Sequence, residues 1–237
     1  MNRLICTREG VEFDLTAPYL PQLTGFIHMA SLDSICYLRE IVKAFGRSIK
    51  YIVDVGACIG GHAVAYRIAF PNAKILAIEP SKWNFPYLER NTKSLPNVKR
   101  IKCLALDKDG DMQIGGPTPV QRPRMDNSIN TGLISIWGQG LRFRETVPTR
   151  LLDNLVAERV DWLKIDVEGA EMEVLHGATD ILLKHRPIVQ MEMRPDNQAM
   201  AGRAAVVPHK IMKRHGYRVV SGIGADWIYF PYDHNGS

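Results

Sequence analysis

Paired cysteines are missing from this sequence. The four cysteines, Cys6, Cys36, Cys58 and Cys103, form no C-x-x-C motif and lie mostly inside apolar segments. Disulfide frameworks and zinc sites are built from cysteines at regular spacing, so the pattern argues against both kinds of framework. It predicts buried thiols in a reducing compartment.

Long apolar runs are missing as well. No stretch approaches 18 apolar residues, and charges occupy the first residues, where a signal peptide would have its apolar core. Internal repeats and low-complexity tracts are also absent. We therefore expect a cytoplasmic protein without a membrane span.

A strong excess of one charge is the third absence. The chain carries 30 basic and 25 acidic residues, a net charge of +5, and the basic residues are scattered. Scattered charge of this size is typical of a solvated surface, and it does not require an anionic partner.

What is present is the composition of an ordered globular protein. Of the 237 residues, 46% are hydrophobic and 23% are charged. A chain of this length buries roughly 70–75% of its unfolded surface, which is enough for one self-sufficient core. We predict a single domain over residues 1–237 with four parts: an N-terminal extension (1–49), a first half (50–106), an insertion (107–150) and a second half (151–237).

Apolar runs and helical patterns alternate from residue 50 onward. Nearly continuous apolar character marks strands that helices cover on both faces, and the alternation predicts a mainly parallel sheet with right-handed crossovers. The last two strands are close enough to form an antiparallel hairpin. The expected strands are 50–55, 73–79, 98–106, 160–167, 186–193, 217–222 and 226–230. The expected helices are 61–70, 82–95, 170–185 and 204–215.

Two segments depart from this alternation. Residues 1–49 predict a short β or irregular start and then a helix, with Ser31 as N-cap, Asp33 in the first turn and Gly46 just past its end. This piece either covers a ligand cleft as a lid or simply packs on the sheet edge. Residues 107–150 hold short strand candidates among glycine, proline and arginine, which is typical of an insertion that selects a substrate.

The stretch VDVGACIGG, residues 53–61, follows the first predicted strand. Ligands of such sheets bind at the carboxyl ends of the strands, where Gly56 permits a sharp turn and Gly60 permits close approach of the next helix. A dinucleotide site needs a glycine at the middle position, where Cys58 would crowd a diphosphate, and no P-loop lysine follows. The remaining common ligand is S-adenosylmethionine.

An acidic residue lies near the carboxyl end of each of the first two predicted strands. Asp54 is placed to reach the methionine ammonium of that ligand, directly or through water. Glu79, 19 residues after Gly60, is placed to accept hydrogen bonds from both ribose hydroxyls. The backbone of Ala105 is a candidate adenine contact. The alternative is that Asp54 only caps the turn and that Glu79 is surface charge.

A second acidic group occurs in and after WLKIDVEGAEMEVLHGA, residues 162–178. Asp166 ends a strand, Glu168 lies in the turn, and Glu192 ends the next strand. Carboxylates at adjacent strand ends repel one another unless a cation, a proton or a donor lies between them. Acids at a helix N-terminus also offset its macrodipole, and that effect is enough to explain Glu171.

Seven stretches resemble, in this order, the FkbM-type S-adenosylmethionine-dependent methyltransferases: VDVGACIGG, AIEP, LALDKDG, NTG, TRLLDNL, LKIDVEGAEMEVLHGA and PIVQMEM. The resemblance runs from Tyr51 to Arg194, and KIDVEGAE is its most specific element. It implies an α/β fold of the Rossmann-like class I methyltransferase type, with a seven-stranded sheet and helices on both faces. It also implies methylation of a hydroxyl on a sugar, glycan or natural-product acceptor. The family usually has asparagine where Cys58 stands.

The predicted cofactor site takes residues from both acidic groups and their loops: Asp54, Gly56, Ala57, Gly60, Glu79, Pro80, Ala105 and Asp166. A hydroxyl acceptor must also lose its proton, either to a carboxylate or through a divalent ion that lowers the pKa of the hydroxyl. We predict Asp166, Glu168 and Glu192 in one of these roles, as base cluster or as ligands of Mg²⁺, Mn²⁺ or Ca²⁺. The metal scheme is preferred because Lys164 is the only cation near them in sequence.

Other polar residues are candidates for the acceptor side. Lys164 shares a strand face with Asp166, and Asn130 lies in the insertion, so both are predicted substrate contacts. His62 is a further candidate base, although a histidine at a helix start is more often structural. The arginines of the insertion either hold an oxygen-rich acceptor or belong to a solvated loop: Arg122, Arg124, Arg142 and Arg144.

Two other functions remain open at this point. The basic insertion suggests RNA as the acceptor, but a coherent basic stripe with interleaved aromatics is lacking, which argues against a nucleic-acid partner. A binding module that has lost the reaction is the other alternative. This alternative is disfavoured, because a protein that has lost the reaction has no physical need for clustered carboxylates.

Overall fold

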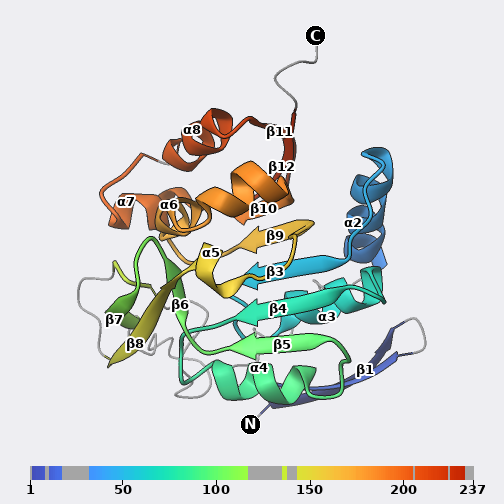
Figure 1. Ribbon diagram of the computed structural model, residues 1–237. Coiled ribbons are helices and arrows are strands. Elements are labelled where there is room, and N and C mark those ends of the chain that lie inside the picture. The colour runs from blue at the N-terminus through green and yellow to red at the C-terminus, as the bar shows by residue number, and fades with distance from the viewer. Residues whose placement is uncertain are drawn as a thin grey trace.

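The computed structural model describes residues 2–8, 11–17, 32–116, 135–137, 143–204, 206–223 and 225–232. Within these residues the strands form one seven-stranded sheet, a three-stranded sheet and a two-stranded hairpin (Figure 1). Helices cover both faces of the large sheet. The predicted α/β class is therefore confirmed.

The large sheet has the strand order β11-β12-β10-β9-β3-β4-β5. Strand β12 runs antiparallel to both of its neighbours, whereas the other pairs in the sheet are parallel. The parallel strands therefore end at one common edge. The bounds are β3 (Tyr51–Val55), β4 (Lys74–Ile78), β5 (Val98–Ile101), β9 (Trp162–Ile165), β10 (Ile188–Glu192), β11 (Tyr217–Ile223) and β12 (Asp226–Pro231).

Alternate residues of each central strand face two different cores. On one face Ile52 and Trp162 are fully buried with side chains from α2 and α3, and on the other face Val53 and Leu163 are buried with side chains from α5, α6, η2 and α8. This two-sided burial explains why the strands read as continuous apolar runs. The helices are α2 (Leu32–Ala44), α3 (Gly61–Ala69), α4 (Phe85–Thr92), α5 (Leu152–Leu155), α6 (Glu171–His176), η2 (Ile181–His185, a π-helical turn), α7 (Pro195–Met200) and α8 (Val207–Arg214).

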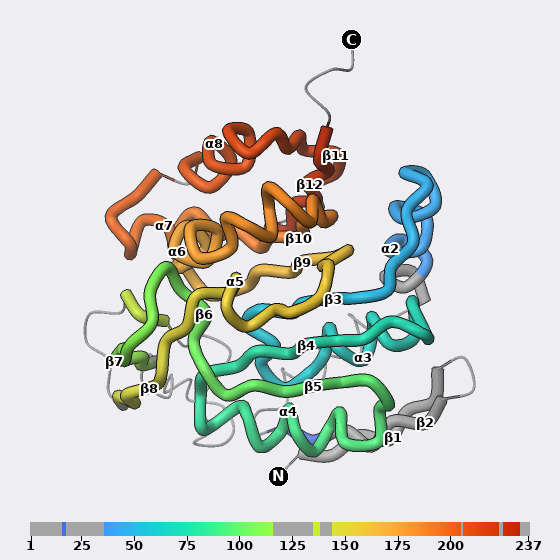
Figure 2. Tube along the Cα trace, in the orientation of Figure 1, coloured from blue at the N-terminus to red at the C-terminus, as the bar shows by residue number. Residues whose placement is uncertain are grey.

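The predicted third strand over residues 98–106 is wrong as a single element. The chain leaves the large sheet after β5, and β6 (Leu104–Leu106) pairs instead with β8 (Phe143–Leu151), which also pairs with β7 (Gly110–Gly116). Leu104 and Leu106 are buried in a third cluster with apolar side chains of β7 and β8, which gives this short strand its own core. The insertion thus forms a small sheet beyond the carboxyl ends of the parallel strands (Figures 1 and 2).

The predicted helix over residues 170–185 is also divided, into α6 and η2. Gly177 lies at the end of α6 with ordinary helical backbone angles, φ −76° and ψ −3°. A Cβ at this position would lie 1.9 Å from the carbonyl oxygen of Leu106. The glycine therefore lets the end of α6 pack directly on the backbone of β6.

The N-terminal extension contains a hairpin of β1 (Asn2–Arg8) and β2 (Val11–Ala17), followed by α2. Thr16 donates its backbone N–H to Oδ1 of Asn91 at 2.8 Å, and Leu38 of α2 is buried in the first core. Helix α2 lies near the amino-terminal end of β3 (Figure 1), and no described residue of the extension lines the cavity described below. The described part of the extension thus packs on α4 and on the first core. Gly46 has the expected left-handed conformation, φ +58°.

Some predictions for the extension and the cysteines concern residues that are only partly described. Ser31 and the side chain of Asp33 lie outside the described residues. Cys36, Cys58 and Cys103 are free thiols, Cys103 buried and Cys36 exposed. Among the described helices, none has the length and apolar character needed to cross a membrane.

Replacing Gly177 with alanine tests the contact between α6 and β6. A Gly→Ala change at a helical φ in open space stabilises a protein by about 0.4–1 kcal/mol. Here the methyl group would clash with the backbone of β6, so we expect Gly177→Ala to lower the free energy of unfolding by about 1–3 kcal/mol. Urea denaturation measures the difference, and a gain in stability would contradict the described packing.

Candidate functional site

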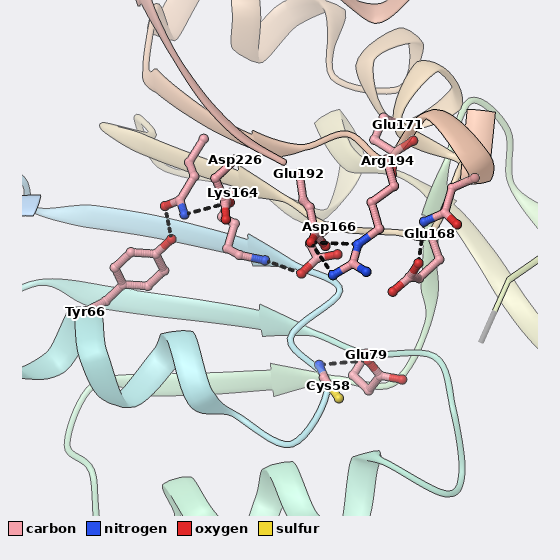
Figure 3. Close-up of polar contacts among 12 residues, drawn as sticks. Cys58, Tyr66, Glu79, Lys164, Asp166, Glu168, Glu171, Glu192, Arg194 and Asp226 are labelled. Atoms are coloured by element: carbon pink, nitrogen blue, oxygen red, sulfur yellow. Dashed lines mark hydrogen bonds and ion pairs between the residues drawn. The ribbon is translucent and has the colours of Figure 1, made fainter. Parts of the chain in front are cut away.

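A cavity of about 330 Å³ lies at the edge where the parallel strands end. Acids of both predicted groups line it, Glu79 of the first and all three of the second (Figure 3). The predicted residues that line it are Gly56, Ala57, Glu79, Pro80, Asp166, Glu168 and Glu192. Asp54, Gly60, Ala105 and Lys164 do not line it, and Asn130 lies outside the described residues.

Two glycines shape the loop between β3 and α3. Gly56 has φ +82°, and a Cβ there would lie 1.7 Å from the carbonyl oxygen of Asp166, so the loop crosses directly over the end of β9. Gly60 has φ +94°, but its Cβ position faces Cγ2 of Thr92 at 2.9 Å. Gly60 therefore serves the packing of this loop on α4 and not the approach to a ligand that we predicted.

Cys58 lies between these glycines with φ +50°, in the left-handed region. Asparagine tolerates this conformation better than cysteine does, which gives a physical reason for asparagine at this position. The backbone N–H of Cys58 donates to Oε2 of Glu79 at 2.9 Å, so the loop still bonds to the end of β4. The cysteine side chain lines the cavity.

Glu79 is not surface charge, because only 4% of its surface is exposed. Its carboxylate accepts the N–H groups of Cys58 and Ser81, at 2.9 and 3.0 Å, and the amide of Asn84 at 3.2 Å. Burial raises the pKa of Glu79 to about 7 against the opposing effect of these hydrogen bonds. Glu79 thus fixes the loop and also presents an acid to the cavity.

Asp54 is fully buried, and neither carboxylate oxygen has a hydrogen-bond partner among the described residues. It therefore does not cap the turn after β3. Burial raises its pKa to about 6, while Lys164 lowers the pKa and Asp166 raises it. Asp54 does not line the cavity, so it cannot touch a ligand there directly. Of our two predictions for Asp54, only contact through water remains.

Lys164 does not reach the cavity, which contradicts its expected contact with substrate. It is 1% exposed and donates its ammonium to Oδ2 of Asp166 at 2.9 Å (Figure 3). Burial lowers the pKa of Lys164, but Asp166 and Asp54 outweigh this and raise it above the ordinary value. The side chain points along the sheet face to the acid at the strand end, so it positions Asp166.

The three predicted acids do converge. One carboxylate oxygen from each of Asp166, Glu168 and Glu192 lies within 4.8 Å of the other two. Their pKa values differ because their partners differ. Burial raises the pKa of Asp166, yet Lys164 outweighs it and holds that pKa below the usual range. Burial and the charge of Asp166 raise the pKa of Glu168 to about 7 and that of Glu192 to about 8.

Arg194 is a second cation at the cluster, and it was not predicted from the sequence. It donates Nε and Nη2 to Oε1 of Glu192 at 2.9 and 2.8 Å (Figure 3). It follows Glu192 by two residues, just before the proline that begins α7. This closeness in sequence could have predicted the contact. It also contradicts our argument that Lys164 is the only cation near enough to compensate the acids.

The turn that carries Glu168 is held from two sides. Glu168 and Gly169 both have positive φ, +51° and +103°. From the insertion, Ser135 donates its hydroxyl to the carbonyl of Glu168 at 2.8 Å, and from α7, Asn197 donates its amide to Oε2 of Glu168. Trp137 donates its indole N–H to the carbonyl of Gly169 at 3.1 Å. The insertion therefore fixes a predicted catalytic side chain.

Three other titratable residues complete the site. Glu171 accepts the backbone N–H of Gly169 at 3.1 Å, a structural contact at the start of α6. His62 lines the cavity, and burial together with Lys164 lowers its pKa well below the ordinary value, so its ring is neutral. Asp226 lines the cavity from β12 and was not predicted. Its place in the sequence could have predicted it, because Asp226 begins an antiparallel strand and so lies at the edge where the parallel strands end.

The chain resembles known methyltransferases in sequence. A family model described as the methyltransferase FkbM domain matches residues 54–219. Methyltransferase sdnD of Sordaria araneosa is 30% identical over 162 residues, which cover 56% of this chain and 62% of that protein. Methyltransferase 1 of Beauveria bassiana is 27% identical over 149 residues, which cover 55% and 59%. The chain thus spans about three fifths of the length of these relatives.

Solved structures extend the likeness to the fold. A methyltransferase FkbM from Methylobacillus flagellatus gives a TM-score of 0.51 at 17% identity, covering 77% of this chain and 43% of that one. A putative caffeoyl-CoA O-methyltransferase from Staphylococcus aureus gives 0.53 at 14% identity, covering 90% and 92%. The sheet is thus that of the class I methyltransferases. Because the family model covers more than half of its residues, the chain belongs to the FkbM methyltransferase family.

Proposed function

We propose that the protein is an S-adenosylmethionine-dependent O-methyltransferase whose acceptor is a hydroxyl of a sugar, a glycan or a natural-product scaffold. Membership of the family implies this methyl donor. The observation that carries the proposal is the arrangement of the cavity: Glu79 lies at one strand end, and three convergent carboxyl groups lie one and two strands beyond β3.

The cavity suits an adenosyl ligand without phosphate groups. Glu79 offers carboxylate oxygens to ribose hydroxyls, and Leu104, Ile114 and Ile136 offer an apolar surface to a base. Among the described lining residues the one arginine, Arg194, is already bonded to Glu192, so no free guanidinium is left for a diphosphate. When bound, S-adenosylmethionine supplies a methyl group on a positively charged sulfur.

The acids differ in what each can do with the acceptor's proton. Asp166 stays ionised beside Lys164 and is a weak base, and the carboxylate of Glu192 already accepts two hydrogen bonds from Arg194. Glu168, with a pKa of about 7, is closest to the match that general base catalysis requires. Glu168 is therefore the residue that would take the proton from the acceptor hydroxyl when that hydroxyl is methylated.

A divalent ion is not needed in this scheme. Three carboxylate oxygens within 4.8 Å would suit a hard cation such as Mg²⁺. The chain, however, supplies two positive charges of its own, Lys164 on Asp166 and Arg194 on Glu192. The compensation that clustered acids require is thus present in the protein, and we propose the metal-free form.

Glu79→Ala tests the cofactor site. Loss of the carboxylate removes the acceptors for the ribose hydroxyls, each worth about 1.5–3 kcal/mol when the acceptor is charged. We expect the affinity for S-adenosylmethionine, measured by calorimetry, to fall at least tenfold. Glu89→Ala, an exposed acid on α4, is the matched control and should bind normally. Normal binding by Glu79→Ala would contradict this assignment.

Glu168→Gln and a pH profile test the base. Because the pKa of Glu168 is raised to about 7 and the base must be ionised, kcat should fall as pH drops below 7. We expect the glutamine variant to lose about 10²–10⁴ in kcat and to lose that acidic limb. Labelled methyl transfer to a panel of saccharides and scaffold alcohols gives the readout. A variant with an unchanged profile would rule out Glu168 as the base.

Chelation tests the metal-free form. With Lys164 and Arg194 as the compensating charges, turnover should be the same after treatment with EDTA as before it. The measurement is the rate of labelled methyl transfer with and without the chelator. Loss of activity that added Mg²⁺ or Mn²⁺ restores would instead favour the three acids as metal ligands.

A further inference from the structure

Asp226 is an acid of the cavity that the mechanism above does not use. It is the first residue of β12 and pairs in register with Glu192, the last residue of β10. Its side chain is partly exposed and lines the same cavity as Asp166 and Glu168. Asp226 and Glu192 therefore present two carboxyl groups side by side at one edge of the sheet.

A buried chain of hydrogen bonds fixes the carboxylate of Asp226. The hydroxyl of Tyr66, on α3, donates to Oε1 of Gln190 at 2.8 Å, and Nε2 of Gln190 donates to Oδ1 of Asp226 at 3.3 Å (Figure 3). Tyr66 is fully buried and Gln190 is 8% exposed. Burying a phenol and an amide is costly unless both are bonded, so this chain holds Asp226 in one orientation. The hydrogen bond to Gln190 is made at Oδ1.

Burial lowers the pKa of Lys164, and the charges of Asp166, Asp54 and, last, Asp226 raise it. The ammonium of Lys164 is bonded to Asp166, and Asp54 lies beside Lys164 on the neighbouring strand, in register. The hydrogen bond of Lys164 is to Asp166, whereas the hydrogen bond of Asp226 is to Gln190. The oriented carboxylate also lines the cavity, where a ligand can reach it.

The strand order places Asp226 on the acceptor side. β12 is three strands from β3 and four from β4, which carry the cofactor loops. At about 4.8 Å between neighbouring strands, Asp226 lies roughly 14 Å across the sheet from β3, too far to share the ribose with Glu79. The nearer acids, Asp166, Glu168 and Glu192, are those assigned to the reacting hydroxyl.

We propose that Asp226 is a substrate-binding residue that accepts a hydrogen bond from a second hydroxyl of the acceptor, on the carbon next to the one that is methylated. An ionised carboxylate only accepts hydrogen bonds, so it selects a donor and rejects an ether at that position. Directly opposite residues of antiparallel strands have Cβ atoms about 4.5–5.5 Å apart, so Asp226 lies next to the acid cluster to which Glu192 belongs and can reach a neighbouring hydroxyl. The acceptor is therefore a vicinal diol, an inference that rests on the proposed function.

Asp226→Asn is the direct test, because it keeps the shape and the oxygen that Gln190 bonds while it removes the charge. The probes are methyl glycosides with vicinal hydroxyls, added to protein saturated with S-adenosylhomocysteine, and the readout is the affinity from ligand-observed NMR. A hydrogen bond to a charged group is worth about ten- to a hundredfold, so we expect that loss of affinity for the diol. Affinity for the adenosyl ligand and the unfolding temperature should not change.

Two further variants and one further probe sharpen the result. Asp111→Asn, an exposed acid of β7 outside the cavity, is the matched control and should bind the diol normally. Tyr66→Phe releases Gln190 without touching Asp226, and we expect a smaller loss of diol affinity. The monodeoxy analogue that lacks the second hydroxyl should bind the wild type and Asp226→Asn equally, because the two changes remove the same contact.

Each remaining outcome overturns the proposal. Unchanged diol affinity in Asp226→Asn would do so, and so would an equal loss for the diol and its deoxy analogue. A tenfold loss of adenosyl affinity would make Asp226 a cofactor contact instead. If no vicinal diol of the panel binds while S-adenosylhomocysteine does, the acceptor class is wrong but a methyltransferase remains. If S-adenosylhomocysteine itself does not bind, the proposed function fails first.

Discussion

The chemistry of the cavity depends on one buried ion pair, between Lys164 and Asp166. Burying an unpaired ammonium costs roughly several kcal/mol. The folded state therefore needs the acids around Lys164 at this edge of the sheet. Lys164 in turn keeps Asp166 ionised at the carboxyl end of β9, where Asp166 lines the cavity. Burial and the negative charge of Asp166 then raise the pKa values of Glu168 and Glu192. One pair thus makes three neighbouring carboxyl groups chemically different.

The same edge joins parts of the chain that are far apart in sequence. The loop after β3 can lie over β9 because Gly56 has no side chain, and the insertion reaches back to hold the turn of Glu168 through Ser135. From the other side α7 and its preceding residue supply Asn197 and Arg194. The insertion and α7 therefore both hold the turn that carries Glu168.

The residues that sequence could locate are those whose position follows from strand ends. Glu79 and Asp166 follow apolar runs, so a parallel sheet brings them to one edge. Local sequence patterns do not predict contacts across that edge. The alternation of side chains along a strand places Lys164 on the same face as Asp166, but only the burial of Lys164 in the structure shows that it cannot touch a substrate. Asp226 was missed because its role depends on the pairing of β12 with β10. The run 98–106, VKRIKCLAL, concealed a change of sheet near Lys102, because apolar residues occur on both sides of that lysine.

A crystal structure with S-adenosylhomocysteine bound would test the central claim most directly. The account predicts ribose hydroxyls on Glu79, the sulfur directed to the acid cluster, the ammonium of Lys164 on Asp166, and Arg194 still bonded to Glu192. An adenosyl group bound in a different hollow would contradict it. So would a metal ion held by Asp166, Glu168 and Glu192 with the guanidinium of Arg194 displaced.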